Sequence, residues 1–160
     1  MKSDNPQRSE LPPPPQGVRL EWHEVPASVR REVEARLGSP VVHAISQPSG
    51  FSPGVAARVR LADGRRVFVK ALGPEPNPES PAIHRREARV VAALPAEAPV
   101  PPLLATYDEG EGGWIVLIFA DVEGRHPAQP WRTDELSRVL DELSALSRML
   151  TPSPLREREA

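Results

Sequence analysis

Short runs of apolar and β-branched residues dominate the middle of the chain. They occupy residues 41–46, 55–62, 65–72, 103–107 and 114–119. Runs of this length, bounded by proline, glycine and acidic residues, are typical of β-strands. The second and third runs flank Asp63-Gly64, a dipeptide strongly favoured in tight hairpin turns. The pattern therefore predicts five strands, with a two-residue hairpin connecting the second to the third.

Two other segments show helical spacing before and between these strands. In residues 26–37, Val29, Val33 and Leu37 recur every four positions, with Pro26 expected in the first turn and Gly38 just past the end. In residues 80–94, Ser80 is expected as the N-cap, followed by a proline, and Pro95 should end the helix. The first helix therefore precedes all five strands, and the second lies between the third and fourth.

A third helix is predicted near the C-terminus, with Thr133 as its cap. Its apolar residues form one broad stripe that consists of Leu136, Val139, Leu140, Leu143, Leu146 and Leu150. Such a stripe requires a partner surface, because an exposed stripe favours association. We expect this helix either to pack on another lobe or to mediate self-association through residues 133–150.

The order of elements predicts an α+β fold. We expect a five-stranded, mostly antiparallel sheet with one packed helix, flanked by an N-terminal and a C-terminal helix. The predicted divisions are a disordered proline-rich tail (1–20), the sheet domain (21–122), a linker (123–132), the terminal helix (133–150) and a second tail (151–160).

Composition narrows the function classes. The formal net charge is −2 and aromatic residues make up 4%, which disfavours nucleic-acid binding. The absence of cysteine excludes disulfides, thiol catalysis and cysteine-type zinc sites, and fits a cytoplasmic location. The histidines show no metal-binding spacing, so no metal site is expected. No apolar run is long enough for a membrane span, and no secretory signal is visible.

Lys70 is the first candidate for chemistry, because it lies deep within a predicted strand. Strand alternation places Phe68, Lys70 and Leu72 on one face and Val67, Val69 and Ala71 on the other. A lysine between large apolar side chains is costly unless its ammonium meets a partner or reaches water. The alternative is an edge lysine whose ammonium extends into solvent.

Glu87 is the second candidate. A helical wheel that starts at Ile83 places Glu87 at the centre of the apolar stripe in residues 80–94. A carboxylate on a core-facing stripe needs a cation, and the preceding strand offers Lys70. The alternative is a surface ion pair within the helix.

The loop Gly50-Phe51-Ser52-Pro53-Gly54 connects the first two strands. Glycines there would let backbone N–H groups approach a phosphate closely. The loop matches neither a Walker A motif nor the glycine-rich loop of protein kinases, and by itself it could equally be an ordinary turn.

Taken together, a strand lysine, a helix glutamate and a strand that runs into a linker resemble the small lobe of kinases. Four segments resemble the aminoglycoside phosphotransferase family in particular, and the likeness extends over about residues 22–155. They are Phe51 to Arg58, Arg66 to Lys70, His84 to Ala88, and Phe119 to Pro127.

This resemblance implies that the chain binds ATP. Lys70 would contact the α- and β-phosphates and pair with Glu87, and loop residues Gly50, Phe51, Ser52 and Gly54 would cover the phosphates. The adenine would be held by backbone groups near Phe119, Ala120, Asp121 and Val122, and Ala71 would pack on the ring. Ala120 stands where relatives carry an acidic residue, which backbone recognition tolerates.

The family's catalytic His-Gly-Asp segment and its later metal-binding aspartate do not occur in these 160 residues. We therefore expect a truncated phosphotransferase, without catalytic residues or magnesium ligands of its own and inactive alone. A small-molecule acceptor would bind only if a C-terminal lobe is supplied. The alternative is a non-enzymatic interaction module that binds a partner through its terminal helix.

Overall fold

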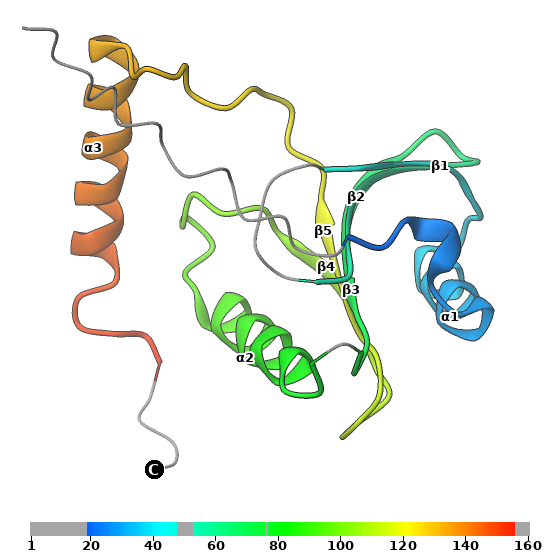
Figure 1. Cartoon of the computed structure of the whole chain (residues 1–160). Coiled ribbons are helices and arrows are strands. Elements are labelled where there is room, and N and C mark those ends of the chain that lie inside the picture. Colours follow the sequence, from blue (N-terminus) through cyan, green and yellow to red (C-terminus); the bar gives the residue numbers. More distant parts are fainter. Residues whose placement is uncertain (1–18, 48–52, 76, 156–160) are drawn as a thin grey trace, which may run out of the picture.

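The computed structural model describes residues 19–47, 53–75 and 77–155, and its main body is one sheet with a helix on each face (Figure 1). The elements in chain order are η1 (Trp22–Glu24), α1 (Ala27–Leu37), β1 (Val41–Ser46), β2 (Val55–Leu61), β3 (Arg66–Leu72), α2 (Ser80–Ala93), β4 (Leu103–Asp108), β5 (Ile115–Ala120) and α3 (Thr133–Met149). The predicted α+β fold, with five strands and a helix between the third and fourth, is confirmed.

The five strands follow the order β1-β2-β3-β5-β4, and every neighbouring pair is antiparallel. β3 is therefore the central strand, between β2 and β5. In this register Lys70 lies opposite Ala56 on one side and Leu117 on the other. Directly opposed residues of antiparallel strands share a face, so these three side chains belong to the same side of the sheet.

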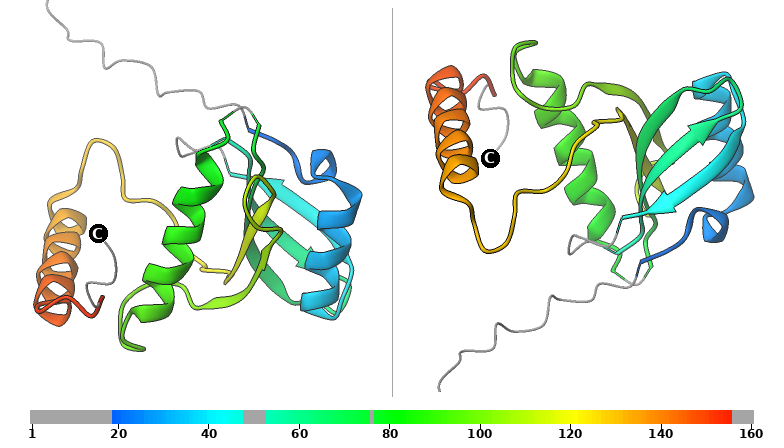
Figure 2. Two further views of the ribbon diagram at one scale, coloured as in Figure 1. Left: turned by 90° about the horizontal axis from the view of Figure 1, so that it is seen from below. Right: turned by 90° about the horizontal axis from the view of Figure 1, so that it is seen from above.

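The two faces of the sheet form separate cores, as strand alternation predicts. On one face, Val67, Val69 and Ala71 are buried together with α1 residues such as Val29 and Val33. On the other face, a smaller cluster of Leu72, Leu117 and Phe119 packs against Ala88 and Val91 of α2. Figure 2 shows α1 and α2 on opposite sides of the sheet. Lys70 therefore lies on the face that α2 only partly covers.

The inward face of α2 differs from the one that the helical wheel predicted. Ile83, taken as the start of the apolar stripe, is 65% exposed, whereas Pro81 and His84 are buried. The inward face therefore follows Pro81, His84, Ala88 and Val91, and Glu87 lies at its edge. The wheel was wrong because it centred the stripe on Ile83, while Pro81, His84 and Ala88 form the inward face together with Val91.

The β2–β3 hairpin is confirmed, but its loop is longer than predicted. The N–H of Leu61 donates to the carbonyl of Arg65, and the N–H of Gly64 donates to the carbonyl of Leu61. Three residues, 62–64, therefore form the loop, with Gly64 at φ +88°. A turn followed by a left-handed glycine is the usual geometry of such three-residue hairpins. Asp63 supports it by accepting hydrogen bonds from the backbone N–H and the guanidinium of Arg65.

Helix ends are shifted slightly from their predicted positions. Pro26, Glu79 and Arg132 are the N-caps of the three α-helices, so Ser80 and Thr133 are the first residues of α2 and α3. The end of α1 is as predicted, because Gly38 adopts the left-handed conformation at φ 66°. A shift of one residue at a helix end does not alter which residues share a face of the helix.

The last helix, α3, lies beyond α2 on the side away from the sheet, at the end of an extended linker (Figures 1 and 2). Leu140 and Leu143 are 54% and 56% exposed, so its predicted apolar stripe is open to solvent. The predicted tail 1–20 lies largely outside the described residues, and the assignment of 133–150 to another lobe stays a prediction. None of the helices in the described ranges is long and apolar enough to cross a bilayer.

Candidate functional site

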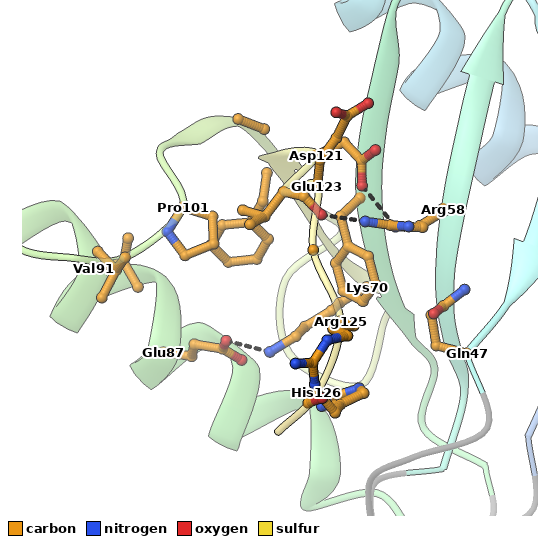
Figure 3. A pocket seen from close by; sticks show the side chains of 16 residues that line it. Gln47, Arg58, Lys70, Glu87, Val91, Pro101, Asp121, Glu123, Arg125 and His126 are labelled. Atoms are coloured by element: carbon orange, nitrogen blue, oxygen red, sulfur yellow. Dashed lines mark hydrogen bonds and ion pairs between the residues drawn. The ribbon is translucent and has the colours of Figure 1, made fainter. Parts of the chain in front are cut away.

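A cavity of about 640 Å³ opens between the sheet, α2 and the linker (Figure 3). The sheet contributes Arg58, Phe68, Lys70 and Phe119 to its wall, and α2 contributes Glu87 and Val91. The remaining wall includes linker residues 120–126. The cavity exists because α2 leaves part of this sheet face uncovered, and the linker crosses in front of it.

Lys70 and Glu87 meet inside this cavity, as the sequence predicted. The Lys70 Nζ atom lies 2.5 Å from Glu87 Oε1 (Figure 3). Both side chains are about a third exposed, at 32% and 30%. The Lys70 ammonium also lies 5.6 Å from the centre of the Phe119 ring, close enough for a cation–π contact. The ammonium is therefore held by a carboxylate and a ring while it remains open to the cavity.

His84 lies one helical turn before Glu87 and is buried against the sheet. Burial lowers the pKa of His84 below its usual 6.5. The nearby carboxylate of Glu87 opposes this shift, and the Lys70 ammonium reinforces it. The neutral form of His84 is therefore favoured beneath the ion pair.

Aromatic and aliphatic side chains form the apolar part of the cavity wall. They are Phe68, Val91, Pro101 and Phe119. Ala71, which was expected to pack on a bound ring, is 1% exposed and belongs to the core on the opposite face. That expectation is wrong, because Ala71 and Lys70 are adjacent in a strand and their side chains point to opposite sides. Phe68 lines the cavity instead.

The start of the linker is fastened to the sheet through Asp121. Its carboxylate is 6% exposed and lies 2.9 Å from Arg58 Nε and 3.7 Å from Arg66 Nε. Arg66 also pairs with Glu123, and this ion pair lowers the pKa of Glu123. Arg58 of β2 and Arg66 of β3 thus hold the start of the linker against the sheet beside the cavity.

Two of the backbone groups that were expected to recognise adenine already have protein partners. The N–H of Ala120 donates to the carbonyl of Pro102 at 2.9 Å. The carbonyl of Val122 accepts a hydrogen bond from the Arg58 guanidinium. The cavity wall includes Phe119, Ala120, Asp121 and Val122, and their contact with adenine stays a prediction. The N–H of Ala120, however, is not available to a ligand, because it donates to the Pro102 carbonyl.

The predicted phosphate loop is only partly described. Gly50, Phe51 and Ser52 lie outside the described residues. Gly54 has φ +95°, and a Cβ at this position would lie 2.5 Å from the Ala71 carbonyl oxygen and 2.6 Å from Leu72 Cδ1. The carbonyl of Gly54 accepts a hydrogen bond from Leu20 N–H. Close approach to β3 therefore explains this glycine without any ligand.

Sequence reasoning missed five charged or aromatic residues of the cavity: Arg58, Phe68, Glu123, Arg125 and His126. Alternation along the strands could have identified the first two, because Arg58 is directly opposite Phe68 and two residues from Ala56, the partner of Lys70. No sequence signal places the linker residues Glu123, Arg125 and His126, because the path of the linker depends on tertiary contacts. Within the described ranges, no cluster of three potential metal ligands occurs.

No protein-family model matches the chain, and no curated protein matches it. Among solved structures, the chain is similar to a crystal structure of a protein provisionally described as a fructosamine-3-kinase from Thermobifida fusca YX-ER1. The two chains are 29% identical with a TM-score of 0.47, over 63% of this chain and 33% of that one. The match thus spans about a third of that protein's length. A match with this TM-score does not support a fold assignment. The fold is assigned from the order of the strands and the placement of α2.

Proposed function

We propose that this chain supplies the ATP-binding small lobe of a kinase-like phosphotransferase that acts on small molecules, as in the aminoglycoside phosphotransferase family. The observation that carries the proposal is the ion pair between Lys70 and Glu87, which faces a cavity below the linker. A lysine on the third strand, held by a glutamate of the packed helix, is the arrangement that kinases use to bind nucleotide phosphates.

The size and chemistry of the cavity fit a nucleotide. Its volume of about 640 Å³ lies within the range typical of small-molecule sites. Phe68 and Phe119 offer apolar ring surfaces, and Asp121 and Val122 offer backbone groups at the edge. Lys70 would hold the phosphates, because its ammonium is accessible and fixed in direction by Glu87. When bound, ATP would supply the phosphoryl group, and these residues would bind and orient it.

Turnover would need groups that these 160 residues do not contain. The 160 residues include no His-Gly-Asp segment to provide a general base. We therefore propose nucleotide binding without phosphoryl transfer for this chain by itself, and binding of an acceptor only together with a second lobe. For the phosphate acceptor, we propose only that it is a small molecule.

Titration of the full chain with a fluorescent ATP analogue, with ATP as competitor, tests this proposal. We expect Lys70→Ala to weaken ATP binding about tenfold or more, since a charge-assisted contact is lost. Arg86→Ala is the matched control, because this cation is exposed on the same helix as Glu87 but does not line the cavity. Equal ATP affinity in wild type and Lys70→Ala, or no binding at all, would contradict the proposal, as would phosphate release with magnesium.

A second candidate function is binding of another protein chain through α3. The exposed Leu140 and Leu143 favour it, because α3 presents an apolar stripe to solvent. We propose a second copy of the chain as the partner. Sedimentation velocity of wild type should show concentration-dependent association, which Leu140→Asp removes. A wild type that stays monomeric over the accessible concentration range would exclude self-association.

A further inference from the structure

The linker brings a second cation to the cavity that contains Lys70. Arg125 lines the cavity together with Lys70 and His126 (Figure 3). Its side chain is 67% exposed, although its guanidinium donates hydrogen bonds to the carbonyl of His126 and the carboxylate of Glu135. An arginine that is fixed at its tip and open to solvent in a cavity is suited to receive an anion.

The fixing group is Glu135, which lies in the first turn of α3 and is 6% exposed. Its Oε1 atom accepts a hydrogen bond from the Arg125 guanidinium, and its Oε2 atom accepts the N–H of Ala128 at 2.7 Å. The backbone N–H of Ala128 and the Arg125 guanidinium lower the pKa of Glu135, so the carboxylate is charged at neutral pH. One buried carboxylate thus holds the linker at two points and sets the direction of Arg125.

The phosphate chain of a nucleotide needs more positive charge than Lys70 alone supplies, and Arg125 can provide it. The cations that line the cavity each face one carboxylate: Lys70 faces Glu87, Arg58 faces Asp121, and Arg125 faces Glu135. A nucleotide phosphate chain carries several negative charges, which one paired lysine would neutralise poorly. Arg125 uses Nη1 for its hydrogen bond to His126 and Nη2 for its hydrogen bond to Glu135. A guanidinium has five N–H donors in a fork that fits phosphate oxygens, so donors remain for a ligand.

Building on the proposed function, we propose that Arg125 binds the phosphate chain of the nucleotide together with Lys70, and that Glu135 is the residue that positions Arg125. The linker would then be part of the binding site as well as a connection to α3. Arg125 contacts the ligand in this proposal, whereas Glu135 acts only through Arg125 and the backbone of Ala128.

Affinities of the full chain for ATP, ADP and adenosine, measured by calorimetry, test this assignment. Arg125→Ala should weaken ATP and ADP binding about tenfold and change adenosine binding by less than about twofold. Arg125→Lys, which keeps the charge but not the fork, should restore part of the loss. Glu135→Gln should weaken ATP binding by about threefold and leave adenosine unchanged. Arg132→Ala is the matched control, because this exposed linker arginine does not line the cavity.

Each other outcome separates this inference from the proposed function. If Lys70→Ala loses ATP affinity while Arg125→Ala binds ATP like wild type, the role of Arg125 is refuted and the nucleotide site stands. If Arg125→Ala weakens adenosine as much as ATP, Arg125 shapes the cavity and does not meet phosphate. If wild type binds none of the three ligands, the proposed function itself fails.

Discussion

Lys70 of β3 and Glu87 of α2 form an ion pair of 2.5 Å across the boundary between the sheet and its covering helix. Each side chain keeps about a third of its surface exposed. Water competes for such a pair, so its contribution to the free energy of unfolding is small, about 1 kcal/mol or less. Its geometric effect is larger, because Glu87 holds the ammonium of a long, flexible side chain at one place in the cavity. Stability and ligand affinity should therefore respond differently when the pair is broken.

Glu87→Gln provides the first prediction. The amide keeps the shape of the side chain but not its charge, so Lys70 loses its orienting partner. We expect ATP affinity to fall about threefold to tenfold, while the free energy of unfolding in urea changes by less than about 1 kcal/mol. Glu97→Gln, an exposed carboxylate outside the cavity, should change neither quantity. A variant that binds ATP more tightly would show that Glu87 competes with phosphate for Lys70.

Gly54 and Gly64 provide a matched pair of glycine substitutions. Both have positive φ, at +95° and +88°. A methyl group at position 54 would collide with the backbone oxygen of Ala71, whereas at position 64 it would meet nothing within 4 Å. Gly64→Ala should cost about 1 kcal/mol of unfolding free energy from its backbone conformation alone. Gly54→Ala should cost more than about 2 kcal/mol, because the backbone of β3 at Ala71 must also move. Equal midpoints in urea for the two variants would contradict the close approach of Gly54 to β3.

Burial of His84 predicts a pH dependence of stability. The pKa of His84 is lower in the folded protein than the 6.5 expected when the chain is unfolded. The unfolded state therefore binds the proton more readily as pH falls, and folding becomes less favourable. Stability should be full above about pH 6.5 and should decline as pH falls below that value, until the folded pKa is passed.

Melting temperature measured at intervals between about pH 7.5 and pH 5 checks this prediction. His84→Leu should flatten the curve in this window, since the titrating group is gone. Carboxylates with lowered pKa, such as Asp108 and Glu135, lose their contribution only at lower pH, so they do not mimic the effect. A wild-type curve that does not change between pH 7 and 5 would refute the assignment to His84.

Asp121 provides the fourth prediction, because its carboxylate is nearly buried between Arg58 and Arg66. Asp121→Asn keeps the volume and removes the charge, so Arg58 loses its carboxylate partner and Arg66 keeps only Glu123. We expect a loss of about 1–3 kcal/mol in unfolding free energy. The control is Asp134→Asn, an exposed residue whose ion pairs are 3.5 Å long, and it should cost less than about 0.5 kcal/mol. Similar losses in both variants would mean that Asp121 does not anchor the linker.

The alternation of side chains along the strands was readable from the sequence, because it depends only on the period of two in extended backbone. It assigned Lys70 to the face opposite Ala71, and it contained the information that Phe68, not Ala71, faces the cavity. The hairpin was readable as well, since the dipeptide Asp63-Gly64 is strongly favoured in tight turns between strands. Its loop length was not, because the register of β2 and β3 also depends on how their side chains pack against α1 and β5.

By itself, the sequence determined the order of the five strands and three α-helices, though not η1, and the pairing of one strand lysine with one helix glutamate. Local backbone preferences and the cost of an unpaired charge near a core are sufficient for both. Only the tertiary structure decided which side of α2 meets the sheet, where the linker runs, and that Arg125, held by Glu135, lines the cavity. These depend on contacts between residues far apart in the chain, whose free energies no local pattern reports.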